Sequence, residues 1–66
     1  MKAEDAEDEG LRLLREAGDG PISLPEYRVL VGKLKTLLAD LSKTEGDLIW
    51  AELFAEPLHM LAPKKG

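Results

Sequence analysis

The side chains whose type and spacing could support covalent or acid–base chemistry are two serines, one histidine and the carboxylate pair Glu52 and Glu56. Nucleophilic catalysis requires a nucleophile held by a base, which is itself held by a third group. Ser23 and Ser42 both stand at predicted helix N-caps, and neither is near His59 in the sequence. We therefore expect His59 to be a surface or partly satisfied imidazole. The prediction is that the protein has no catalytic residues and is not an enzyme.

The sequence also lacks the residues that a metal or cofactor site would need. A structural zinc site needs about four Cys or His ligands, but the chain has no Cys and one His. Glu52 and Glu56 share a helix face four residues apart, an arrangement typical of a solvated helix edge where there is no cleft. The glycines do not have the spacing of a phosphate-binding loop. We therefore predict no metal, no cofactor and no small-molecule substrate.

The elements that must position any functional surface are constrained by size. With 66 residues, of which 44% are hydrophobic and 33% charged, the chain can form one domain but no Rossmann unit or barrel. Small domains often depend on a disulfide, a metal or an oligomer interface for stability. Because the first two are excluded, self-association is the remaining possibility. No apolar run approaches the roughly 18 residues of a membrane span or resembles a signal peptide, so we expect a cytoplasmic protein with no membrane partner.

The net charge of −4 is concentrated at the N-terminus. Residues 1–9 contain five acidic side chains against Lys2, and the remaining acidic and basic residues cancel. Residues 1–8 are predicted to form an acidic, frayed arm, in which carboxylates suit the start of a helix. Two alternatives remain open: that the arm docks on a basic surface or that it mimics nucleic acid.

The first helix is predicted at residues 9–17. Its apolar content begins at Leu11, and Gly10 costs roughly 1 kcal/mol relative to Ala within a helix. Gly18 supplies a C-cap, and the sequence 19–21 (Asp-Gly-Pro) stops the helix.

The second helix is predicted at residues 24–41. Ser23 and Glu26 form a capping box, in which the Glu reaches back to the cap amide, and Pro25 lies in the first turn. One apolar stripe of ordinary width follows at helical spacing, with Val29 on the opposite side. The stripe consists of Tyr27, Leu30, Val31, Leu34, Leu37, Leu38 and Leu41.

The third helix is predicted at residues 45–56. Ser42 opens a second capping box after a short connection, and Pro57 is expected to end or kink the helix near Ala55 or Glu56. The apolar residues of this segment cover nearly half of the helix circumference. Residues 9–62 would form one helical domain, and residues 63–66 a flexible basic tail.

We therefore predict an all-α fold, a small helical hairpin or three-helix unit that assembles as a dimeric helical bundle. The wide apolar face of the third helix exceeds what one partner helix can cover, and large aromatic residues are enriched at interfaces. The predicted function is a non-enzymatic protein-binding module, an adaptor, regulator or inhibitor that acts as a homodimer; the alternative is that these residues are simply core. The predicted interface residues are Trp50, Leu53, Phe54, Leu58, Met60 and Leu61.

A nucleic-acid-associated regulator is the alternative function. It would use a face formed by Lys33, Lys35 and Lys43. The segment from Leu37 to Leu53 has the helix-turn-helix order, but its second helix is acidic and would meet phosphates with the wrong sign. Nucleic acid is therefore the less favoured partner. In a third hypothesis the acidic arm is the effector and the helices only display it.

Overall fold

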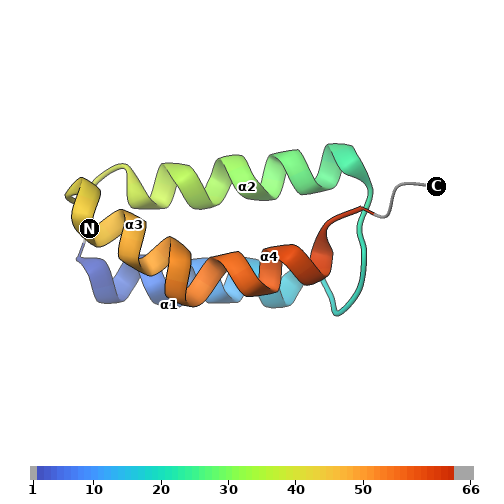
Figure 1. The fold of residues 1–66 in the computed structure, drawn as a ribbon, viewed down its shortest axis with the longest axis horizontal. Coiled ribbons are helices and arrows are strands. Elements are labelled where there is room, and N and C mark those ends of the chain that lie inside the picture. The colour runs from blue at the N-terminus through green and yellow to red at the C-terminus, as the bar shows by residue number, and fades with distance from the viewer. Residues whose placement is uncertain (1, 64–66) are drawn as a thin grey trace.

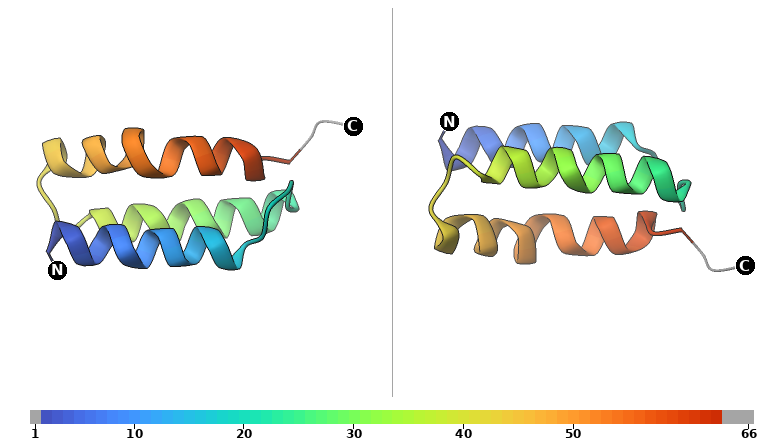
Figure 2. Two further views of the ribbon diagram at one scale, coloured as in Figure 1. Left: turned by 90° about the horizontal axis from the view of Figure 1, so that it is seen from below. Right: turned by 90° about the horizontal axis from the view of Figure 1, so that it is seen from above.

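The computed structural model describes residues 2–63, and this part of the chain consists of helices and short connections without a β-strand. In chain order they are α1 (Ala3–Glu16), α2 (Leu24–Leu38), α3 (Lys43–Ile49), the π-helical segment η1 (Trp50–Phe54) and α4 (Ala55–Leu61). The last three run on without a break, and we call residues 43–61 the third helix. Figures 1 and 2 show α2 antiparallel to α1 and the third helix parallel to α1. The predicted all-α three-helix unit is confirmed; the dimer remains a prediction.

The first helix begins at Ala3, six residues before the predicted start, so the prediction of 9–17 was wrong at its N-terminal end. Residues 3–8 are helical rather than frayed, and Ala6 is fully buried. Two effects extend the helix. Small residues face the third helix, which α1 contacts at both α3 and η1, and Glu4 and Asp5 lie in the first turn, where negative charge favours a helix.

The predicted stop of the first helix is confirmed. Gly18 has a φ of +104°, a conformation that favours glycine, and its N–H donates to the carbonyl of Arg15. The connection to α2 is then held at one point, where the Ile22 N–H donates to the carbonyl of Leu61 over 3.0 Å. This bond satisfies a carbonyl at the end of α4 that has no partner within its helix.

Both predicted N-caps are confirmed. Ser23 Oγ accepts from the Glu26 N–H at 3.3 Å, and Ser42 Oγ accepts from the Glu45 N–H at 3.2 Å. The returning half of the box differs from the prediction, because each glutamate carboxylate accepts from the serine hydroxyl rather than from the cap amide. These caps begin α2 at Leu24 and α3 at Lys43, two residues before the predicted 45.

The second helix ends at Leu38 rather than at residue 41. The chain tightens after Leu38, where the Ala39 N–H donates to Thr36 and the Leu41 N–H donates to Leu38, both across three residues. Such bonds are characteristic of a tight final turn. They bring the chain round to Ser42 and the next helix.

Pro57 was expected to end or kink the third helix near residue 55 or 56. An end there was wrong, because the helix continues to Leu61, and a kink stays a prediction. Proline lacks an N–H and clashes with the carbonyl four residues earlier in a regular α-helix. Here η1 immediately precedes α4, and the Ala55 N–H donates to the carbonyl of Trp50, five residues back. The wider π turn changes the local backbone pairing just before Pro57, which occupies the first turn of α4.

The π segment also changes which residues of the third helix face inward. The buried positions are Gly46, Ile49, Phe54, Leu58 and Leu61. Their spacing is three or four residues except for one step of five, from Ile49 to Phe54, which coincides with η1. The inward face is therefore narrower than a regular α-helix would make it.

The core lies between the three helices. Its buried members are Leu14, Leu30, Leu34, Ile49, Phe54, Leu58 and Leu61. Phe54 and Leu34 are the largest fully buried side chains. The Phe54 ring lies directly against Gly10 of α1, so closely that a Cβ at Gly10 would be 2.6 Å from Cε1 of the ring. The absence of a side chain at Gly10 thus leaves the space on α1 that the Phe54 ring occupies.

Candidate functional site

The six residues predicted as a protein interface divide between core and surface. Phe54, Leu58 and Leu61 are 0%, 3% and 2% exposed, so they are occupied inside the single chain. Trp50 and Leu53 are partly buried, and Met60 is 63% exposed. An interface role for these residues stays a prediction, and within the folded chain only the last three reach solvent.

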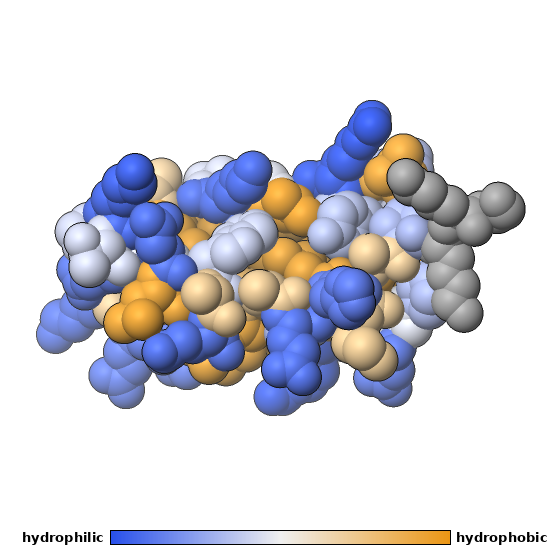
Figure 3. All heavy atoms as spheres, viewed as in Figure 1, coloured by the Kyte–Doolittle hydropathy of each residue, from blue (hydrophilic) through white to orange (hydrophobic). Residues whose placement is uncertain are grey.

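Trp50 packs against another aromatic residue of the third helix. Its ring meets that of Phe54 edge to face, with centroids 6.3 Å apart and an interplanar angle of 77°, a favourable geometry for aromatic pairs. The side chain also lines a hollow between the end of α2 and α3, with Leu38 on the facing helix. Figure 3 shows that apolar side chains reach the surface between α2 and the third helix.

A longer apolar depression runs along the other seam of α2, where that helix packs against α1. Two hollows adjoin there because both are lined by Leu13 and Lys33. We call this depression the α1–α2 groove. Its apolar lining is formed by Leu13, Ala17, Ile22, Pro25, Val29, Leu30 and Leu37.

Val29 adds an exposed apolar side chain to the groove. Its side chain is 57% exposed, and Gly32, one turn further along, has open space where a side chain would stand. From the sequence, Val29 was expected on the side of α2 opposite the apolar stripe, with no role in an interface. The overlooked signal was the run of Val29, Gly32 and Thr36 along one side of α2, which leaves that side apolar or small.

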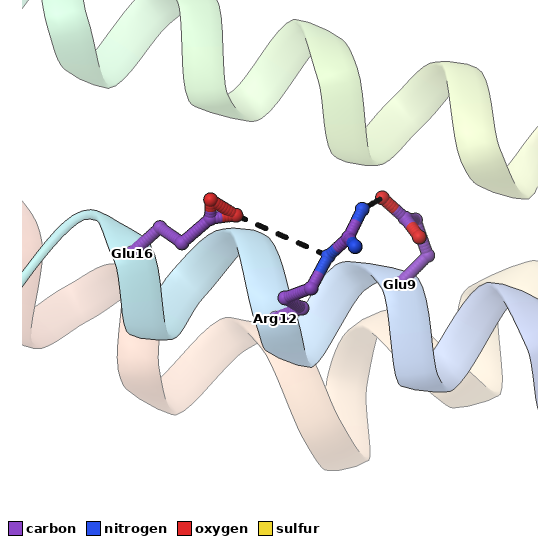
Figure 4. A network of polar contacts seen from close by, with 3 residues as sticks. All are labelled: Glu9, Arg12 and Glu16. Carbon is purple, nitrogen blue, oxygen red and sulfur yellow. Dashed lines mark hydrogen bonds and ion pairs between the residues drawn. The ribbon is translucent and has the colours of Figure 1, made fainter.

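The two walls of the groove differ in charge. Glu9 and Glu16 line it from α1, and Lys33 lines it from α2. Figure 4 shows Arg12 between the two glutamates; its guanidinium binds Glu9, and its Nε lies 3.9 Å from Glu16 Oε1. Two carboxylates therefore share one arginine on the α1 wall, which remains acidic.

The charges at the α2 wall are arranged differently. Glu26 also lines the groove, near the start of α2, but its carboxylate accepts the Ser23 hydroxyl at 2.7 Å. Within residues 2–63, Lys33 makes no ion pair. The ammonium group of Lys33 is therefore the charge that α2 offers at the middle of the groove.

The three lysines of the predicted nucleic-acid face are not brought together. Lys35 and Lys43 line the hollow beside Trp50, together with Asp47. Lys33 lies instead in the α1–α2 groove. A nucleic-acid site on this fold would therefore have two of the three lysines.

The side chains considered for catalysis have other roles or lie on the surface. Ser23 and Ser42 cap helices, and His59, Glu52 and Glu56 are exposed. Among residues 2–63, no three His, Asp or Glu side chains are placed to hold a metal ion. In the same part of the chain, no helix has the length and apolar character needed to cross a membrane.

No protein-family model, curated protein or solved structure matches this chain. Its function must therefore be argued from its own surfaces.

Proposed function

We propose that the protein is a non-enzymatic protein-binding module whose α1–α2 groove receives an amphipathic helix from a protein partner. The observation that supports this proposal is the continuous apolar lining of the groove, with Val29 57% exposed in its α2 wall. Helices that lay an apolar face into such a groove are a recurring mode of protein recognition. The added helix would complete a four-helix arrangement.

The dimensions suit a helix of about three turns. From Pro25 to Leu37 the α2 wall advances by about 18 Å at 1.5 Å per residue. Its lining is mainly apolar and includes four charged side chains, Glu9, Glu16, Glu26 and Lys33. Protein interfaces commonly combine apolar area with a smaller number of polar and charged groups.

The groove is a better surface for this function than the one predicted from sequence. Phe54, Leu58 and Leu61 are occupied in the core, so the predicted surface is reduced to Trp50, Leu53 and Met60. A partner on that side would meet the hollow beside Trp50, which three charged side chains and a serine also line (Lys35, Lys43, Asp47 and Ser42). On the α1–α2 side it would meet two adjoining hollows that extend along two helices.

The test is a selection of amphipathic helical peptides from a displayed library against the wild-type chain, with counter-selection against Val29→Glu. Because Val29 is exposed, the substitution should leave the fold intact while placing a charge in the groove. The matched control is Leu48→Glu, which alters a leucine that is 55% exposed on α3. We expect peptides that bind the wild-type and Leu48→Glu chains but not Val29→Glu. Recovery only of peptides that bind all three equally would overturn the proposal.

A nucleic-acid function has one observation in its favour, because Lys35, Lys43 and Trp50 line the same hollow. Phosphates would pair with the lysines and a base could stack on the indole. Trp50 is the single tryptophan, so its fluorescence reports directly on this hollow. The function predicts quenching by an oligonucleotide that weakens steeply as salt is added. Unchanged fluorescence at low salt and micromolar protein would exclude it.

A further inference from the structure

The charges of the two helices that form the groove are opposite. In α1 there are six acidic and two basic residues, a net charge of −4. In α2 there are one acidic and three basic residues, a net charge of +2. Of these charged residues, Glu9 and Glu16 line the groove from α1. Lys33 lines it from α2 together with Glu26, whose carboxylate accepts the Ser23 hydroxyl.

A surface of this kind is complementary to itself. We propose that the occupant of the α1–α2 groove is a second copy of this chain, with α1 of each copy packed against α2 of the other. This inference rests on the proposed function, since it names the partner of the same groove. Symmetric dimers use one patch on both copies, and here that patch provides both partners of the charge pairing.

Charge also decides between the two possible symmetric arrangements. A two-fold axis perpendicular to the helices would set α1 against α1, placing Glu9 and Glu16 of one copy opposite the same residues of the other. A two-fold axis parallel to the helices sets α1 against α2 of the other copy, antiparallel, at both contacts. In this arrangement the Glu9 and Glu16 wall of one copy faces the Lys33 wall of the other. Like-charge contacts are costly and opposite ones favourable, so the second arrangement is selected.

The size of the face is adequate for a weak to moderate dimer. Two helices about 22 Å long and about 10 Å wide present roughly 400 Å² in projection, or about 800 Å² for the two copies. Side-chain relief adds to the accessible area, which brings the contact toward the range of about 1,200 Å² where stable interfaces begin. Association should therefore depend on protein concentration.

The test uses two charge-reversed chains. One is Glu9→Lys with Glu16→Lys, which gives the α1 wall the same charge as Lys33. The other is Lys33→Glu, which gives the α2 wall the same charge as Glu9 and Glu16. Alone, each variant would place like charges at both contacts of its dimer. Mixed, the basic α1 of the first faces the acidic α2 of the second, and the acidic α1 of the second faces the basic α2 of the first.

Sedimentation equilibrium across protein and salt concentrations measures the outcome. We expect the wild-type chain to dimerise, each variant alone to dimerise at least about tenfold more weakly, and the equimolar mixture to recover the wild-type affinity. Leu48→Glu, outside the groove, should dimerise like the wild type. Circular dichroism melts verify that each variant is folded. If a reversal prevents folding, Glu9→Gln with Glu16→Gln and Lys33→Met weaken the same contacts without repulsion.

Two results would overturn the inference. A wild-type chain that stays monomeric throughout has no second copy in its groove. Reversed variants that dimerise as well as the wild type, in a dimer that Trp50→Ala disrupts, would place the second copy on the other side of α2. A monomeric chain that still selects groove-dependent peptides from the library loses this inference but keeps the proposed function. A chain that fails both experiments loses both.

Discussion

Replacing Gly10 by Ala is the sharpest test of how the three helices pack. In an isolated helix the change is favourable, because Ala is better than Gly by about 1 kcal/mol. In this structure the new methyl group would meet the Phe54 ring, 2.6 Å from Cε1 and 3.0 Å from Cε2. Phe54 is fully buried, so the ring has no free space into which it can turn. Helix propensity and core packing therefore oppose each other at one residue.

The expected net effect is a loss of stability. Adding a methyl group to a filled core costs roughly 1–3 kcal/mol, and contact with several ring atoms places Gly10→Ala at the upper end. Subtracting the propensity gain leaves a decrease of about 2 kcal/mol in the free energy of unfolding. For a domain of this size, that lowers Tm by roughly 8–16 °C.

Two controls separate packing from propensity. Gly32 has open space around its Cβ position, and Gly46 would make an ordinary contact at 3.6 Å with Leu38. Gly32→Ala and Gly46→Ala should therefore raise stability by up to about 1 kcal/mol each. Phe54→Leu replaces the ring with a smaller aliphatic side chain. Gly10→Ala should therefore cost much less stability in the Phe54→Leu background than in the wild-type chain.

Thermal and urea unfolding of these variants, at one low protein concentration, provide the measurement. The reasoning is refuted if Gly10→Ala raises Tm as much as Gly32→Ala does. That result would mean that the Phe54 ring does not pack against α1 at Gly10. A Gly10→Ala defect of the same size with Leu at position 54 would likewise assign the cost to another contact.

Three further changes test the helices individually by urea unfolding. Deleting the exposed Ala51 removes the extra residue of η1 and should lower stability by about 3 kcal/mol, because Pro57 then lies inside a regular α-helix. Adding Pro57→Ala to the deletion should recover the lost stability. Equal stabilities of the deletion with and without Pro57→Ala would contradict this coupling. Ser42→Ala should cost about 1 kcal/mol by removing the cap of α3, whereas Ser42→Gly should cost only a few tenths; equal losses would show that the hydroxyl is not the cap. Arg12→Ala should change stability by less than about 0.5 kcal/mol, because both of its ion pairs are exposed; a loss above about 1 kcal/mol would contradict this.

Features governed by neighbouring residues could be predicted from the sequence. The serine caps at Ser23 and Ser42 and the glycine stop at Gly18 depend on hydrogen bonds and backbone angles within a few residues. The three-helix organisation followed because each cap is succeeded by apolar residues at helical spacing. These predictions do not depend on what the helices pack against.

The start of α1 could not be obtained in this way, because it depends on a distant contact. Gly10 was interpreted only as a local cost, and the acidic residues before it as a frayed arm. In the structure Gly10 makes room for Phe54, which is 44 positions later in the sequence. Packing against the third helix then stabilises α1 back to Ala3. Nothing within residues 1–17 shows that this partner exists.

The same reasoning explains why the candidate site moved from the third helix to the α1–α2 groove. At a uniform 100° per residue, the apolar residues of the third helix spread over nearly half its circumference. This suggested an apolar face wider than the other helices of the same chain could cover. The π segment inserts one step of five between Ile49 and Phe54, which returns Phe54, Leu58 and Leu61 to the side that is already buried. The apparent surplus was thus largely a consequence of assuming a regular helix. Once it is removed, the α1–α2 groove beside the exposed Val29 is the surface on which the proposed function rests.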